Sequence, residues 1–120
     1  MNIAITVWGN RISPVFDVAG TLLIGRIENR KLIKKDWTSF TPGKVDDLLQ
    51  VLKKMDVHVL VCGAISTEPA EQIIAGEVKL ISFVSGNAHE LLEDFTKNQS
   101  VQDTFLMPGC SALTSQRTRL

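Results

Sequence analysis

Hydrophobic and polar residues along the chain follow two different periods. Residues 2–8 and 21–27 are predicted strands, and residues 31–38 alternate partly and carry lysines typical of an edge strand. Residues 57–61 form a nearly continuous apolar run, which fits a strand covered on both faces, and residues 78–84 form the last strand. Apolar residues at helical spacing follow each of the last three strands. The predicted order is therefore β-β-β-α-β-α-β-α.

Residues with capping side chains precede the three predicted helices. Thr41, which a proline follows, is predicted to cap the first helix, and Ser66 or Thr67 the second. Asn87 is predicted to cap the third helix. Gly76 is predicted to end the second helix in a left-handed conformation.

This order predicts an α/β fold of three layers. Right-handed crossovers place the first, fourth and fifth strands parallel, with helices on both faces of a mixed five-stranded sheet. The hairpin of the second and third strands extends the sheet on the other side of the first strand. Open sheets of this class bind ligands at the carboxyl ends of their parallel strands, where the strand order reverses. We expect that crevice between the first and fourth strands.

The residues that follow the three parallel strands are the candidate binding site. They are mostly small or polar, and a strand–turn–helix connection directs free backbone N–H groups at an anion. Ordinary connections without a ligand are the competing interpretation. The candidate binding residues are Trp8, Gly9, Asn10, Ser13, Pro14, Cys62, Gly63, Ala64, Ser66, Thr67, Ser85, Gly86 and Asn87.

Two thiols are candidate metal ligands. Cys62 ends the fourth strand, where a thiolate suits a soft metal, although a free cysteine there is also typical of a small buried hydrophobe. Cys110 follows the last helix, either as an exposed redox-active thiol or as a simple tail residue. Two cysteines and two histidines without CxxC or HxxxH spacing do not form a closed metal site. A homo-oligomer would bring four thiols together, and the sequence leaves that state open.

Composition narrows the possible partners and the compartment. The 120 residues carry 13 basic and 13 acidic side chains, so no global field attracts nucleic acid or a membrane surface. No secretory signal or membrane-spanning run is visible, which favours a cytoplasmic protein with reduced thiols. We expect one domain over residues 1–110 and a mobile polar tail over residues 111–120.

Motifs for several enzyme classes are missing from the sequence. It has no GxxxxGK[ST] loop, no GxGxxG turn and no GxSxG elbow. A two-metal nuclease needs clustered acidic residues at the catalytic edge, but Asp17 is the only acidic residue before Glu28. The sequence therefore predicts a protein that is not an enzyme.

Four segments of the chain, in this order, resemble the dinitrogenase iron–molybdenum cofactor biosynthesis family. They are Ile3-Ala-Ile-Thr-Val7, Ser13-Pro-Val-Phe16, Val57-His-Val-Leu-Val-Cys-Gly-Ala-Ile65 and Val84-Ser-Gly86. The resemblance implies a ribonuclease H-like fold and a role in cofactor assembly or storage. That role is non-catalytic binding or carriage of an iron–sulfur or molybdenum-containing cluster, with cluster-assembly proteins as partners. Anionic clusters suit backbone N–H groups and small polar side chains.

One departure from the family pattern supports a second interpretation. Many members carry a histidine after Ser-Pro in the first loop, whereas this chain has Val15, which cannot ligate a metal. The alternative is a metal-free regulatory or protein-interaction module that retains the fold, with the apolar loop of residues 15–18 as its contact surface.

Overall fold

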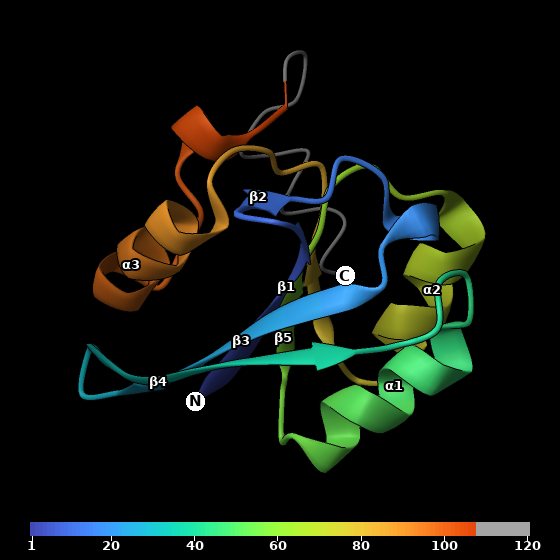
Figure 1. Ribbon diagram of the computed structural model, residues 1–120, viewed down its shortest axis with the longest axis horizontal. Helices are drawn as coiled ribbons and strands as arrows, with labels where there is room; N and C mark the ends of the chain where they lie inside the picture. The colour runs from blue at the N-terminus through green and yellow to red at the C-terminus, as the bar shows by residue number, and fades with distance from the viewer. Residues whose placement is uncertain (108–120) are drawn as a thin grey trace.

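The computed structural model describes residues 1–107, and its centre is a mixed β-sheet (Figure 1). Five strands run across the sheet in the order β4-β3-β1-β5-β6, and a short strand β2 pairs with the end of β1. The predicted five-strand arrangement is confirmed, and β2 is an addition to it. The strands are β1 (Asn2–Trp8), β2 (Arg11–Ile12), β3 (Thr21–Glu28), β4 (Lys31–Ser39), β5 (Val59–Val61) and β6 (Lys79–Ile81).

Strand directions follow the predicted topology. β5 runs parallel to β1 with Ile5 opposite Val61, and β6 runs parallel to β5 with Ile81 opposite Val61. β3 is antiparallel to β1 and also to β4. β3 and β4 therefore form the predicted hairpin, which lies on the other side of β1 from β5. The carboxyl ends of β1, β5 and β6 therefore lie at one edge of the sheet, which we call the C-terminal edge.

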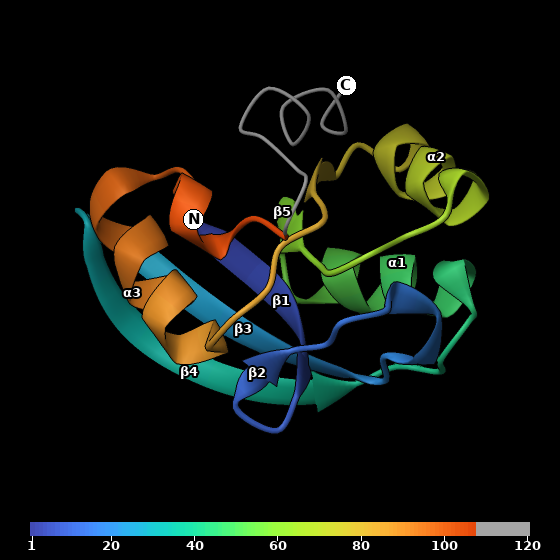
Figure 2. The same ribbon diagram turned by 90° about the horizontal axis from the view of Figure 1, so that it is seen from above.

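Helices cover both faces of the sheet, as Figure 2 shows, and the described residues form three α-helices. The helices α1 (Val45–Lys54) and α2 (Thr67–Ala75) pack on one face, and α3 (Ala88–Asn98) packs on the other. Successive side chains of β1 point to opposite faces of the sheet, so this strand contributes to the hydrophobic core on each face. Ala4 packs in the core beneath α1 and α2, whereas Ile3 and Ile5 pack in the core beneath α3. The predicted three-layer α/β class is confirmed, and the more specific likeness to ribonuclease H stays a prediction.

The predicted start of the first helix is wrong. α1 begins at Val45, because Gly43 has a φ of +76° and the Lys44 N–H donates to the Thr41 carbonyl at 3.2 Å, which closes a turn. Thr41 contributes in another way, since its backbone N–H donates to the Asp47 carboxylate at 2.6 Å. A proline after a threonine thus marks a turn here and not a helix cap.

Two other predicted boundaries also differ from the structure. Gly76 ends α2 with a φ of −80°, and Glu77 takes the left-handed conformation with a φ of 66°. β6 ends at Ile81 and not at Val84, because Phe83 has a φ of 62°, which an extended strand does not allow.

Two predictions lie outside the described residues. They are the candidate ligand Cys110 and the mobile tail of residues 111–120. Within residues 1–107, every helix is too short or too polar to span a membrane.

Candidate functional site

Three loops meet at the C-terminal edge and form what we call the strand-end site (Figure 1). The loop after β1 is joined to the turn after β5, because Ala64 N–H donates to Pro14 O and Phe16 N–H donates to Ala64 O, each at 2.9 Å. The same loop is joined to the segment after β6, since Ile12 N–H donates to Gly86 O at 2.9 Å. The predicted meeting of these three segments is confirmed.

The space over the gap between β1 and β5 is filled by backbone. Gly63 is buried, and a Cβ added to it would come within 2.6 Å of the Pro14 carbonyl oxygen. Only glycine allows the loop to approach the end of β5 so closely. The crevice that we expected between these two strands is therefore closed by the loop that follows β1.

Three polar side chains form a buried row beneath that loop. Each of them directly follows the last residue of its strand that takes part in the parallel pairing of β1, β5 and β6. They are Thr6, Cys62 and Ser82, and none has any exposed surface. Neither hydroxyl has a hydrogen-bond partner among the described residues, and the Cys62 thiol makes one weak contact of 3.5 Å to the Gly63 carbonyl. Burial raises the pKa of the Cys62 thiol, because the thiolate would lose its hydration. In this conformation Cys62 behaves as the small buried hydrophobe of the competing interpretation.

An open hollow lies beside this closed region. It has a volume of about 240 Å³ and lies between the loop after β1 and the segment after β6. Arg11 is exposed on it and, among residues 1–107, is the one cationic side chain of its lining, which comprises Trp8, Arg11, Ile12, Pro14, Ser85 and Gly86. Sequence reasoning missed Arg11, although it is the only cation in the loop that follows the first strand.

The structure divides the predicted site residues by accessibility. Trp8 is 76% exposed and forms one wall of the open hollow, whereas Ser13 is buried and its hydroxyl donates to the Val15 carbonyl at 3.1 Å. The other exposed members of the predicted site are Gly9, Asn10, Pro14, Ser66 and Thr67. The half-buried members are Ala64, Ser85, Gly86 and Asn87. The buried members, besides Ser13, are Cys62 and Gly63.

Helix starts at this edge differ in how they are capped. The Asn87 side chain accepts from the N–H groups of His89 and Glu90 at 2.9 and 3.0 Å, so the predicted cap of α3 is confirmed. Ser66 occupies the same place before α2, but its side chain makes no capping hydrogen bond. The amide oxygen of Asn87 therefore serves α3, whereas the Ser66 hydroxyl stays exposed to solvent.

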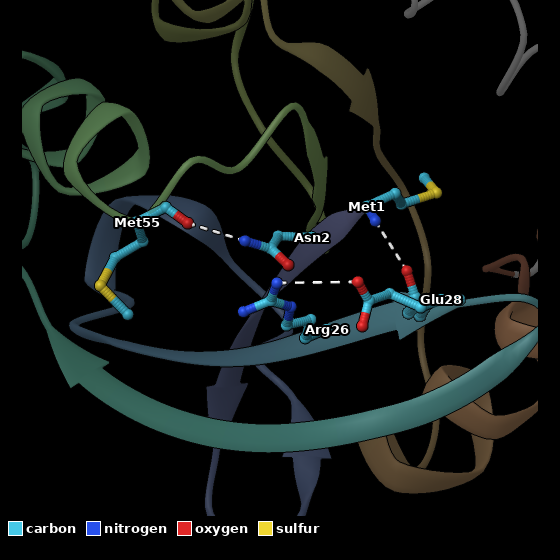
Figure 3. A network of polar contacts seen from close by, with 6 residues as sticks. Met1, Asn2, Arg26, Glu28 and Met55 are labelled. Carbon is cyan, nitrogen blue, oxygen red and sulfur yellow. Dashed lines mark hydrogen bonds and ion pairs between the residues drawn. The ribbon is translucent and has the colours of Figure 1, made fainter.

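A larger groove lies at the opposite edge of the sheet, where the parallel strands begin (Figure 3). We call it the N-terminal groove; its volume is about 410 Å³. Its charged side chains form exposed pairs, with Arg26 3.7 Å from Glu28 and His58 3.1 Å from Asp56. Two hydrogen bonds to backbone carbonyls hold Met1 and Asn2 of its lining, since the Asn2 side-chain amide donates to Met55 O at 2.9 Å and the terminal ammonium donates to Ile27 O at 2.7 Å. Arg26, Lys34 and His58 of the groove therefore already lie beside carboxylates, whereas Lys54 has no such partner among the described residues.

Known proteins of similar structure share this fold at low sequence identity. The protein PH0822 has a TM-score of 0.74 at 14% identity, covering 85% of this chain and 93% of its own. The protein TM1290 from Thermotoga has a TM-score of 0.65 at 20% identity, covering 91% and 98% of the two chains. The apo form of the orange protein from Desulfovibrio gigas has a TM-score of 0.63 at 18% identity, covering 85% and 92%. These likenesses establish the fold alone.

Sequence comparison assigns the family. No curated protein matches the chain. The profile of the dinitrogenase iron-molybdenum cofactor family, in contrast, matches residues 1–98, a span that contains all three loops of the strand-end site. The chain belongs to the dinitrogenase iron-molybdenum cofactor family.

Proposed function

We propose that the protein binds and carries an anionic metal–sulfur cluster as cargo, without catalysis, at the strand-end site. The exposed guanidinium of Arg11 on the hollow of about 240 Å³ carries this proposal. Within the described residues Arg11 forms no ion pair, so its charge is available to an anion. Family membership supports a role connected with a metal cofactor.

Each part of the hollow contributes a different interaction. Arg11 supplies positive charge and up to five N–H donors, and Trp8 supplies a flat apolar wall for polarisable sulfide. The segment of Ser85 and Gly86 closes the other side. No group of three metal-ligating side chains exists within residues 1–107. The proposed cargo is therefore held by charge, hydrogen bonds and contact area, and it keeps its own sulfide ligands.

Tetrathiomolybdate tests the proposal, because it is a coloured dianion of molybdenum and sulfide. Equilibrium dialysis under anaerobic conditions, read by visible absorption, gives its dissociation constant. Arg11→Gln is expected to weaken binding about tenfold, which corresponds to about 1.4 kcal/mol for one charge-assisted contact. The matched control is Arg26→Gln, which removes an arginine already paired with Glu28 in the N-terminal groove and should leave binding unchanged. Equal losses in both variants, or no binding by the parent protein, would contradict the proposal.

A metal-free interaction module remains the second candidate function, and exposed apolar side chains of the first loop favour it. Val15 is 43% exposed and Val18 is 73% exposed, whereas Phe16 between them is buried and anchors the loop. Val18→Glu should abolish capture of a partner from metal-free extracts if this surface is a contact. If the same variant retains tetrathiomolybdate binding, the two candidate functions are separated.

A further inference from the structure

The outer edge of β4 is the longest exposed strand edge of the sheet. β4 stands last in the strand order, and its nine residues pair only with β3 in the described part of the chain. Ile33 and Trp37 are 54% and 56% exposed, four residues apart on this strand. An edge strand with free backbone groups and exposed apolar side chains is a template for another strand.

The charge of the hairpin formed by β3 and β4 differs from that of the rest of the chain. Residues 21–39 contain five of the 13 basic residues but only two of the 13 acidic ones. The basic ones are Arg26, Arg30, Lys31, Lys34 and Lys35. The chain as a whole is neutral, so this edge is a local positive surface.

Helix α3 supports the middle of this edge from behind. Lys35 Nζ lies 3.3 Å from His89 Nδ1, and the Trp37 ring lies 6.0 Å from the His89 ring, between centroids. Figure 2 shows the start of α3 against the curved ribbon of β4. These contacts hold Lys35 and Trp37 in place before any partner arrives, which lowers the entropy cost of binding.

We propose that the outer edge of β4 binds an extended acidic segment of a partner protein by strand addition. Backbone hydrogen bonds would add the segment to the sheet, and Ile33 and Trp37 would contact its apolar residues. Lys31 would contact its carboxylates, and so would Lys34 after leaving Asp36, from which it lies 3.5 Å away. This proposal is independent of cluster binding, because it uses none of the residues of the strand-end site.

A second copy of the chain fits this edge less well. Complete antiparallel overlap of two β4 strands is centred on Lys35 and places the two Lys35 ammonium groups opposite each other, which is destabilising, although it also places each Lys34 opposite Asp36 of the other copy. The hairpin has five basic residues against two acidic ones, so two hairpins repel each other, whereas an acidic strand is attracted to this edge.

The probe is a short soluble peptide that alternates glutamate with valine. Titration into the full chain labelled with ¹⁵N should shift the amide signals of β4 and slow their hydrogen exchange. A peptide with the same sequence and methylated backbone nitrogens removes strand addition but keeps the charge, so it should not bind. Lys31→Glu combined with Lys34→Glu should weaken binding of the first peptide about fivefold. The matched control, Lys53→Glu with Lys54→Glu on α1, makes the same change of charge at another surface.

Each outcome of this titration decides the proposal. Protection of β4 amides by the glutamate–valine peptide alone, with loss only in the β4 variant, supports it. Absence of binding at millimolar peptide, equal binding of the methylated peptide, or equal loss in both lysine variants overturns it. Protection of β4 that rises with protein concentration in the absence of peptide also overturns it, in favour of a second copy as the occupant.

Discussion

The two edges of the central sheet show that the larger hollow is not the better candidate for binding an anion. The N-terminal groove has a volume of about 410 Å³, but its arginine, histidine and one of its lysines already lie beside carboxylates. The strand-end hollow measures about 240 Å³ and presents Arg11 without an ion pair among the described residues. A charge that has no partner in the protein can interact fully with a ligand, whereas a paired charge must first lose its partner.

The two edges also differ in how the backbone closes them. At the C-terminal edge the loop after β1 is hydrogen-bonded to both neighbouring loops and covers the buried Cys62. At the N-terminal edge Met1 exchanges two hydrogen bonds with Ile27, and the Asn2 side chain donates one to the Met55 carbonyl (Figure 3). The comparison predicts that substitutions of similar kind have large effects at the first edge and small effects at the second.

A glycine substitution at each edge should give the largest contrast. Gly63→Ala places a Cβ against the carbonyls of Ser13 and Pro14, and backbone atoms cannot move aside cheaply, so we expect a loss of about 3 kcal/mol or more. Gly76→Ala brings its Cβ to 3.0 Å from Leu49 Cδ2, a flexible side-chain end, and Gly76 has an ordinary φ of −80°. We expect a change below about 1 kcal/mol there. Urea unfolding measures both, and equal losses would refute the tight closure of the C-terminal edge.

Thiol labelling should give the next largest contrast. In Cys110→Ser the remaining thiol is Cys62, whose complete burial and raised pKa should slow reaction with a disulfide reagent about 100-fold or more relative to the unfolded chain. The N-terminal edge is tested by a variant that has one thiol, at position 58, and combines His58→Cys with Cys62→Ala and Cys110→Ser. Its thiol should react nearly as fast as in the unfolded chain, because the His58 side chain is 74% exposed. Fast labelling of Cys62 would show that the strand-end site opens and that this thiol can reach a cargo.

Alkaline pH should act on the same thiol. The folded pKa of Cys62 lies above the ordinary value of 9.0, so the neutral thiol contributes its full stability below pH 9. That contribution is lost as the pH rises above this value, because the unfolded chain then releases a proton that the folded protein retains. The melting temperature of Cys62→Ala should therefore fall less steeply above pH 9 than that of the parent chain. Parallel curves would contradict the raised pKa.

The helix caps at the C-terminal edge should differ by a smaller amount. Asn87→Ala removes two hydrogen bonds to the start of α3 and should cost about 1 kcal/mol. Ser66→Ala removes a side chain that makes no capping bond before α2 and should cost only a few tenths of that. Thermal unfolding of both variants checks this order, and the reverse order would show that Ser66 has a role in solution which this conformation does not show.

The sequence predicted those features of the site that depend on local pattern and on strand order. Asn87 as a cap and the meeting of three loops followed from side-chain chemistry and from right-handed crossovers. Closure at Gly63 did not follow, because it depends on where the loop after β1 lies in space. Arg11 was missed for a related reason: the two-residue strand β2, which places it beside Ser85 and Gly86, is too short to have a pattern.

The smallest expected effect concerns Asp47, a half-buried residue in the first turn of α1. The Thr41 backbone N–H, which donates to Asp47 at 2.6 Å, lowers the pKa of this carboxyl group below its ordinary value of 3.8. Because the pKa of Asp47 is lower in the folded protein than in the unfolded chain, its carboxylate stabilises the fold at pH values above the unfolded pKa. That contribution is lost as the pH falls through 3.8 and below. The melting temperature of Asp47→Asn should therefore lie slightly below that of the parent chain at neutral pH and converge with it in acid. Asp46→Asn, which changes the neighbouring charge in the same helical turn, is the control and should lack this convergence. If both variants follow one pH curve, the hydrogen bond from Thr41 adds nothing beyond the interaction of either carboxylate with the helix dipole.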